Sequence, residues 1–294
     1  AIFALTSSLS TISTDELINT IKTNDGSGWD DYISASVYSH SNCFDDISGD
    51  DNGNIYLWSN YDISCHMSYV EWGSDMLQTT GMRIRDLFVV EPNLVYAISE
   101  EVDGQRLLEY NGIEWSPVPI AVPPYHISKI WASTSAIWGV GDLGTILIYD
   151  FVTWNIHEAG TVDDLNTVYG LNDGTIFIGS KTGRLFIYNG YSFSEAPWDE
   201  LADCGTECQI VQIWGTEDIV YFATNHQLVS YSGGDFNIIS EWPCAEATDC
   251  LNIYDLWGNS TTEIFLAVYD PNHARTDCGN MYLLWFDGVN YHWI

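Results

Sequence analysis

The sequence predicts an all-β fold: a six-bladed β-propeller of four-stranded blades, with a short strand and helix extension at its N-terminus. Three observations predict it. A hydrophobic triplet recurs six times at intervals of 38 to 45 residues, an aromatic residue follows each triplet after eight or nine residues, and an aromatic hairpin motif closes most repeats. A period of about 40 to 45 residues built from β-type segments is typical of propellers.

The triplet marks the first strand of each predicted blade. Its six copies are Ile47-Ser48-Gly49, Leu87-Phe88-Val89, Ile130-Trp131-Ala132, Val168-Tyr169-Gly170, Ile213-Trp214-Gly215 and Leu256-Trp257-Gly258. The second strand is marked by an aromatic residue within an apolar run, at Tyr56, Tyr96, Trp138, Phe177, Tyr221 and Phe265.

A hairpin between the third and fourth strands completes the repeat. The third strand ends in an aromatic residue, a polar residue and usually glycine follow, and another aromatic residue stands three positions after the glycine. The copies span residues 110–115, 149–154, 188–193, 231–236 and 286–291, and Phe151 stands where glycine is expected. Asn-Gly and Asp-Gly pairs supply the positive φ angles of tight hairpins. Because stacked blades bury both sheet faces, we interpret the repeated aromatic residues as packing between blades and not as a ligand site.

These motifs resemble the secreted bacterial β-propeller repeats with the pattern V-x-G, a strand, then G-x-I-x-x-Y-D-G-x-x-W. The segment Ile137 to Asp150 matches this pattern best, and the resemblance extends over residues 43–294. It implies a fold and secretion but no particular reaction, because propellers serve many unrelated functions.

The repeat divides the chain into an N-terminal extension, residues 1–35, and the propeller, residues 36–294. Ser13-Thr14-Asp15-Glu16 predicts a capped short helix within Ser10 to Thr23. Asp25-Gly26-Ser27-Gly28-Trp29 resembles the element that opens a fourth strand, so Trp29 to Ala35 is expected to be an extra or closing strand. It either packs on the propeller itself or pairs with the edge of another molecule. The apolar end formed by Ala1, Ile2, Phe3, Ala4 and Leu5 is a candidate interface.

Length and cysteine usage favour a secreted protein. The 294 residues contain no apolar stretch near the 18 residues of a membrane span, and the start at Ala1 suggests a processed mature form. Seven cysteines suggest an oxidising compartment. The expected local disulfides are Cys43 with Cys65, Cys204 with Cys208, and Cys244 with Cys250, which leaves Cys278 as a free thiol or an intermolecular link. The spacing fits a zinc site poorly.

The strongly negative net charge disfavours anionic partners. Forty-one acidic residues against eight basic ones give a net charge of −33, so binding to nucleic acid or to anionic membranes is disfavoured. The acidity serves solubility or, alternatively, the binding of cations. The densest acidic cluster holds Asp45, Asp46, Asp50, Asp51 and Asn52, whose oxygen atoms suit calcium, although a plain hairpin turn also explains this segment. No other cofactor is expected.

No catalytic motif is present: the sequence lacks a G-x-S-x-G elbow, H-E-x-x-H, a P-loop and a dinucleotide fingerprint, and its seven histidines show no metal spacing. The favoured hypothesis is a secreted non-enzymatic module for protein interaction or structure. One form of it is a subunit of a homo-oligomeric or polymeric surface assembly docked through its N-terminal segment. A carbohydrate-binding propeller is the alternative, suggested by 13 Trp and 18 Tyr residues. A hydrolase with a site in the central channel is the third reading.

Overall fold

A computed structural model describes residues 126–197, 209–242, 251–270 and 281–293, and residues 83–119 except 92–93 and 102–103. Before residue 83 it describes only the backbone of seven strands. The chain divides into two compact units, residues 1–122 with 132–134, and residues 123–131 with 135–294.

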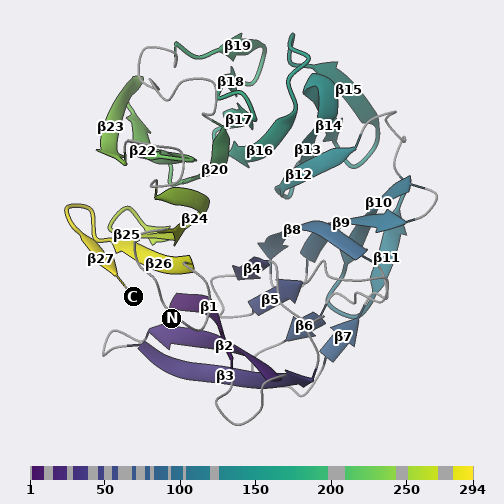
Figure 1. The fold of residues 1–294 in the computed structure, drawn as a ribbon. Helices are drawn as coiled ribbons and strands as arrows, with labels where there is room; N and C mark the ends of the chain where they lie inside the picture. The colour runs from purple at the N-terminus through teal and green to yellow at the C-terminus, as the bar shows by residue number, and fades with distance from the viewer. Residues whose placement is uncertain are drawn as a thin grey trace. The chain divides into compact units, whose positions relative to one another are not determined.

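The first unit holds three antiparallel sheets (Figure 1). The N-terminal sheet has three strands in the order β1-β2-β3: β1 (Ile2–Leu9), β2 (Glu16–Asn24) and β3 (Trp29–Tyr38). The next sheet contains β4 (Asp46–Gly49), β5 (Ile55–Trp58), β6 (Ser68–Val70) and β7 (Leu77–Thr79). The third contains β8 (Arg83–Glu91), β9 (Leu94–Glu101), β10 (Gly104–Tyr110) and β11 (Trp115–Val118).

The second unit holds four further sheets of four strands each. The first comprises β12 (Ile127–Ala132), whose last residue falls in the other unit, β13 (Ile137–Gly141), the 3₁₀ turn η1 (Asp142–Gly144), β14 (Thr145–Tyr149) and β15 (Trp154–Glu158). The second comprises β16 (Leu165–Gly170), β17 (Ile176–Ser180), β18 (Leu185–Tyr188) and β19 (Phe193–Glu195). The third comprises β20 (Ile210–Gly215), β21 (Val220–Thr224), β22 (Gln227–Ser232) and β23 (Asp235–Glu241). The fourth comprises β24 (Asn252–Ser260), β25 (Glu263–Tyr269), β26 (Met281–Phe286) and β27 (Tyr291–Trp293).

Every four-stranded sheet is an antiparallel meander in sequence order, which is the construction of a propeller blade. All six triplets fall in first strands, and all six marker aromatic residues fall in second strands. The predicted all-β propeller fold is therefore confirmed, with six four-stranded sheets among the described strands.

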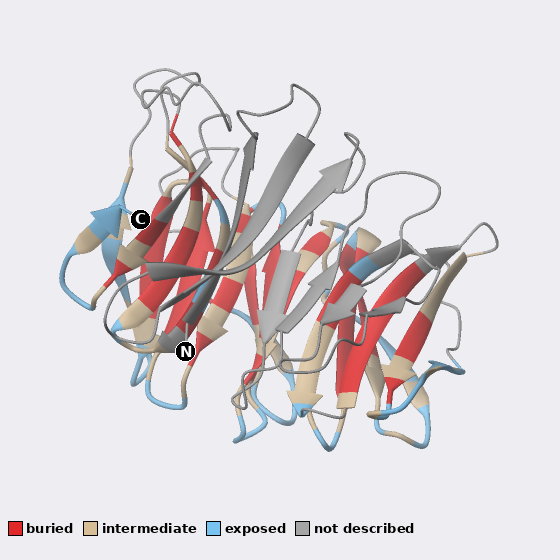
Figure 2. Cartoon of the chain, turned by 90° about the horizontal axis from the view of Figure 1, so that it is seen from below, coloured by how far each residue is buried: buried red, intermediate tan, exposed pale blue. Residues whose placement is uncertain are grey.

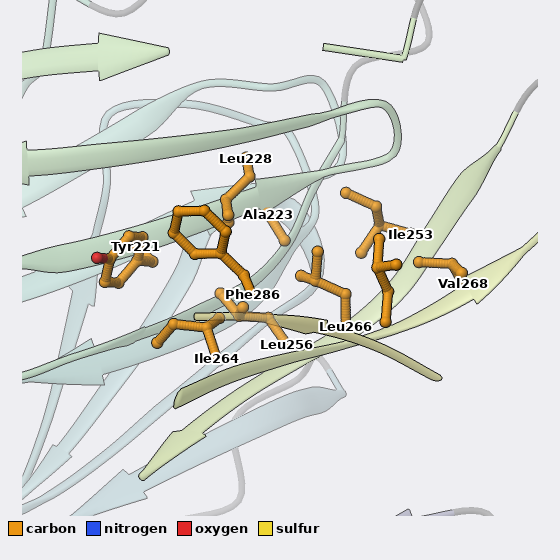
Figure 3. Close-up of a cluster of buried hydrophobic side chains, with 10 residues drawn as sticks. Tyr221, Ala223, Leu228, Ile253, Leu256, Ile264, Leu266, Val268 and Phe286 are labelled. Atoms are coloured by element: carbon orange, nitrogen blue, oxygen red, sulfur yellow. The ribbon is translucent and has the colours of Figure 1, made fainter. Parts of the chain in front are cut away.

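The core of the second unit lies between neighbouring blades. One cluster joins Tyr221, Ala223 and Leu228 of one sheet to Ile253, Leu256, Ile264, Leu266, Val268, Leu284 and Phe286 of the next (Figure 3). Similar clusters join β13 and β14 to β16–β18, and β17 and β18 to β20–β22. In Figure 2 the buried residues run along the strands while the turns stay exposed. In the second unit, neighbouring sheets therefore share these clusters, as expected for stacked blades.

The repeated aromatic residues of the second strands are buried wherever their side chains are described. Phe177 has no exposed surface, Tyr96 and Tyr221 are at most 4% exposed, and Trp138 and Phe265 are 6% exposed. The interpretation of these side chains as packing residues is confirmed for the five sheets whose side chains are described.

The helix predicted within Ser10 to Thr23 is wrong, because Glu16–Asn24 forms strand β2. Its β-branched residues, Ile18, Thr20, Ile21 and Thr23, favour an extended backbone. Strand pairing on both sides, with β1 and with β3, then overrides the local capping signal. Trp29 opens a strand as expected, but β3 pairs with β2 and continues to Tyr38.

Candidate functional site

Most of the predicted site residues lie outside the described part of the chain. All seven cysteines do, as do Ala1 and four members of the acidic cluster, Asp45, Asp50, Asp51 and Asn52. Asp46 opens strand β4, and Ile2, Phe3, Ala4 and Leu5 lie in strand β1, where only the backbone is described. The calcium site and the disulfides therefore stay predictions.

In the second unit, aromatic residues of the first strand of each blade, here called the inner strand, pack against the next blade. The added Cβ of an alanine at Gly170 would stand 2.6 Å from the Trp131 indole, and one at Gly258 would stand 2.5 Å from that of Trp214. Between these two pairs, the Tyr169 hydroxyl donates a hydrogen bond of 2.5 Å to the carbonyl oxygen of Gly215. Burial raises the pKa of Tyr169, which keeps its hydroxyl protonated as a donor. In these three pairs, the glycine of one triplet thus receives the aromatic residue of the preceding triplet.

A chain of polar side chains runs beside this contact. The buried Thr167 hydroxyl donates to Gln212 Oε1 at 2.8 Å, and Gln212 Nε2 donates to Asp255 Oδ1 at 3.1 Å. These residues precede the aliphatic member of the triplet in β16, β20 and β24. Because Gln212 uses both ends of its amide, it links the first strands of three neighbouring sheets.

The first strands also carry a repeated irregularity, which the sequence does not reveal. The pairing of first with second strands shifts by one residue at Arg85, Asn166, Val211 and Tyr254. A bulge redirects its side chain and is frequent beside functional sites. Four different side chains occupy this one position, and Asn166 Oδ1 is shielded from solvent without a hydrogen-bond partner in the structure. The side chain at this bulge thus differs in chemistry from one blade to the next.

The hairpins between third and fourth strands form a second repeated surface. In four sheets an Asn or Asp side chain accepts two backbone N–H groups and holds the turn: Asn111, Asp150, Asn189 and Asp287. Two residues after each of them an apolar side chain projects into solvent: Ile113 is 79% exposed, Val152 83%, Tyr191 94% and Val289 80%. Exposed apolar side chains at one repeated position of a rigid turn suit a contact surface.

The two aspartates that hold these turns, Asp150 and Asp287, have lowered pKa values. The backbone N–H groups of Thr153 and Val152 hold the pKa of Asp150 below its ordinary value. Asp287 is held lower still by the N–H of Asn290 and by His292, whose Nε2 lies 2.8 Å from Asp287 Oδ2. Both carboxylates stay ionised as turn acceptors at neutral pH.

Phe151 departs from the motif and carries backbone strain. Its φ angle is +65°, whereas the glycines at the equivalent position, Gly112, Gly190 and Gly288, have φ between +87° and +92°. The turn therefore keeps its left-handed residue even where the sequence supplies a bulky side chain. The Phe151 ring lies edge-on to Tyr149, with ring centroids 5.5 Å apart.

A charged cluster ties the loop before β16 to β18 and β19. Arg184 binds both carboxylate oxygens of Glu195 at 2.7 Å, and its Nη1 donates to Thr161 Oγ1 and Asp163 Oδ2 at 2.6 and 3.2 Å. Arg184 lowers the pKa of Glu195, while Asp163 is lowered chiefly by the hydroxyl of Thr182. Since this guanidinium has a partner on every side, we assign it a structural role and not a ligand-binding one.

No catalytic constellation forms among the described residues. His226 Nδ1 lies 3.0 Å from the carbonyl oxygen of Leu251, and His292 is held by its own hairpin. Within the same residues, no three His, Cys, Asp or Glu side chains converge as metal ligands, and no helix is long and apolar enough to cross a membrane.

Comparison with known proteins supports the fold. No family model and no curated protein matches the sequence. Among solved structures, the chain is similar to YCF48 bound to D1 peptide, with a TM-score of 0.63 and 12% identity over 94% of this chain and 90% of that one. YCF48 from Cyanidioschyzon merolae gives a TM-score of 0.59 at 10% identity, covering 96% of this chain and 94% of that one.

The extracellular domain of the one-component system BT4673 from B. thetaiotaomicron is a further relative in structure. It gives a TM-score of 0.58 at 13% identity, and the match covers 86% of this chain but 38% of that one. At such identities the likeness shows a shared β-propeller fold, and the function rests on this chain's own surfaces.

Strand β1 offers the most distinctive of those surfaces. In the described part of the chain it pairs only with β2, from Ile2 opposite Asn24 to Leu9 opposite Leu17. Its other edge therefore carries a row of backbone donors and acceptors that no described strand uses. The sequence predicted an apolar N-terminal end at these residues, and in the structure they form the edge strand of a three-stranded sheet.

Proposed function

We propose that this chain is a secreted, non-enzymatic β-propeller that acts as a protein-interaction or structural module, a subunit of an extracellular or cell-surface assembly docked through its N-terminal strand. The observation that carries the proposal is the edge of β1, residues Ile2–Leu9, that pairs with no other described strand. An apolar edge strand is a template for pairing with another chain, and propellers ordinarily leave only short, protected edges.

Strand addition supplies affinity through the main chain and specificity through alternate side chains. β1 has eight residues, which is long for an edge strand. Its sequence contains no proline and no charged residue, the devices by which proteins protect an edge from pairing. The net charge of −33 keeps identical copies apart unless a specific contact offsets the repulsion.

Support for secretion comes from composition and resemblance. Six cysteines stand at spacings suited to local disulfides, and the repeats resemble those of secreted bacterial propellers. One propeller of similar fold is an extracellular domain, and another binds a peptide. Together these favour an extracellular module that recognises a polypeptide.

Light scattering tests the docking role. The mass of the full chain in its native medium is compared with that of a chain lacking residues 1–9, which removes β1 and leaves the four-stranded sheets. We expect a defined oligomer, polymer or heterocomplex that is lost on truncation. Circular dichroism of the truncated chain provides the control for folding. An equal mass for both chains, or a monomer in the native medium, would contradict the proposal.

Carbohydrate binding is a second candidate, favoured by exposed aromatic rings. Tyr191 is 94% exposed beside the amide of Asn189, Tyr254 is 58% exposed and Trp293 is 51% exposed. Such rings stack on sugar faces when polar groups flank them. A glycan array, read with and without calcium to include the acidic cluster at residues 45–52, tests this role, and a blank array in both conditions contradicts it.

A further inference from the structure

The N-terminal sheet has the pairing register of a blade that lacks its first strand. In each complete sheet of the second unit, the last aromatic residue of the third strand faces a β-branched residue of the second strand and an aromatic residue of the fourth. The sets are Tyr149 with Ile137 and Trp154, Tyr188 with Ile176 and Phe193, Tyr231 with Val220 and Phe236, and Phe286 with Ile264 and Tyr291. In the N-terminal sheet, Asn24 faces Ile2 and Trp29 in the same way.

The sequence agrees with this alignment, in which β1 is a second strand. Every second strand carries a β-branched residue followed by an aromatic one at the aligned position. The seven pairs are Ile2-Phe3, Ile55-Tyr56, Val95-Tyr96, Ile137-Trp138, Ile176-Phe177, Val220-Tyr221 and Ile264-Phe265. Trp29 stands five positions after Asn24, the same spacing as in the other hairpins of this kind. The sheet β1-β2-β3 thus corresponds to second, third and fourth strands.

Packing within each unit agrees with this assignment. In the second unit, the first strands β16, β20 and β24 each lie beside the second strand of the preceding blade, and β20 and β24 also lie beside its first strand. In the first unit, β1 lies beside β4, which is the first strand of the following sheet. Contact with β4 suits a first or a second strand, and the pairing register assigns β1 to the second, so its open edge is the edge to which a first strand belongs.

We propose that β1 binds a strand from another polypeptide, of aliphatic–aromatic–glycine sequence, which completes this sheet as a blade. The inference rests on the proposed function and names the partner's chemistry. First strands pair with second strands in one register: Gly170 faces Ile176 and Tyr169 faces Phe177, with the same arrangement in β20 and β24. The donated glycine accordingly faces Ile2, its aromatic residue faces Phe3 and its aliphatic residue faces Ala4.

None of the six triplets of the sequence is available as the donor, because each already lies in the first strand of its own sheet. A donor with neutral or basic flanks is favoured, because the net charge of −33 repels acidic segments. The proposed partner is an extended segment of another polypeptide, apolar at alternate positions and not acidic.

A peptide of this chain's own first strand is a suitable probe. Residues 209–216, Gln-Ile-Val-Gln-Ile-Trp-Gly-Thr, carry the motif without any charged side chain. Fluorescence anisotropy of the labelled peptide with the full chain measures binding, and hydrogen exchange reports which amides become protected. We expect saturable binding and new protection confined to Ile2–Leu9. Lysines added to both ends are expected to tighten binding, and salt to reduce that gain.

Backbone modification separates strand pairing from nonspecific apolar adhesion. Two peptides methylated on alternate backbone nitrogens, in opposite phases, present blocked donors to β1 in one phase only. We expect one phase to weaken binding at least tenfold while the other retains it. A control peptide with aspartate in place of the tryptophan should also fail.

Equal binding of both methylated peptides, equal binding of the aspartate peptide, or protection outside β1 would overturn the inference, as would a probe that does not bind at all. If the probe fails while loss of residues 1–9 still dissolves the native assembly, docking through the N-terminal strand stands and the missing-strand assignment is wrong.

Discussion

Replacing Phe151 with glycine removes a left-handed backbone angle from a residue that disfavours it. A left-handed conformation costs an L-residue about 1–2 kcal/mol. Relief of this cost is partly offset, by roughly 0.5–1 kcal/mol, because glycine loses more backbone entropy on folding than other residues do. The net backbone gain for glycine at φ +65° is therefore about 0.5–1 kcal/mol.

The aromatic ring offsets this gain. The edge-on contact between Phe151 and Tyr149 contributes roughly 0.5–1.5 kcal/mol. Phe151→Gly is accordingly expected to leave the free energy of unfolding within about 1 kcal/mol of the wild type. Phe151→Ala loses the ring and keeps the backbone strain, so it is expected to be the less stable variant by about 0.5–1 kcal/mol.

Gly190 provides the matched control, because it occupies the same turn position with φ +89° and an added Cβ would meet nothing within 4 Å. Gly190→Ala therefore isolates the backbone cost and should destabilise by the same amount of about 0.5–1 kcal/mol. Urea unfolding followed by tryptophan fluorescence measures all three variants. If Phe151→Ala is as stable as Phe151→Gly while Gly190→Ala shows its cost, the assignment of strain to Phe151 is refuted.

Three further substitutions test the contacts between and within blades. Gly258→Ala places a methyl group against Trp214 and should cost roughly 1–3 kcal/mol, measured by thermal unfolding; an unchanged Tm would refute the aromatic-on-glycine contact. Gln212→Leu leaves a buried hydroxyl of β16 without its acceptor and should cost about 1–3 kcal/mol in urea, whereas an isostable variant would show that the polar chain adds nothing. Arg184→Met should lose stability relative to the wild type above pH 5, and the difference should shrink as pH falls below 4.5, the ordinary pKa of Glu195. Because the hydrogen bond from Arg184 to the Thr161 hydroxyl does not depend on pH, only a difference of undiminished size in acid would refute the ion pair.

The sign of the acid effect follows from the direction of the pKa shift. Arg184 lowers the pKa of Glu195 in the folded chain, so this carboxyl binds a proton more readily when unfolded. Its contribution is complete above the unfolded pKa and is lost as pH falls through the folded one. Since Glu195 is largely exposed, solvent screening keeps that contribution small, on the order of 1 kcal/mol or less.

Local signals predicted the repeated parts of the fold. The triplets and marker aromatic residues identified first and second strands because their spacing is set by blade geometry, and each copy reinforces the others. The helix within Ser10 to Thr23 failed for the opposite reason. A single capping signal has no repeat to check it, and pairing with β1 and β3 outweighed it.

The candidate site was only partly visible in the sequence. Ile2 to Leu5 stood out as an apolar end, but a count of residues cannot show that β1 has one pairing partner among the described strands. The inner-strand bulges at Asn166 and Tyr254 left no local signal, since a bulge depends on the register of the facing strand.

By itself the sequence determined the all-β class, the repeat and the position of most blade strands, because hydrophobic periodicity and turn residues act over a few neighbours along the chain. Tertiary structure decided what depends on partners distant in sequence: that Gly258 receives Trp214, that Gln212 links three sheets, and that Ile2-Phe3 stands in the register of a second strand. These contacts join residues that lie more than 20 positions apart, so only the packed chain brings them together.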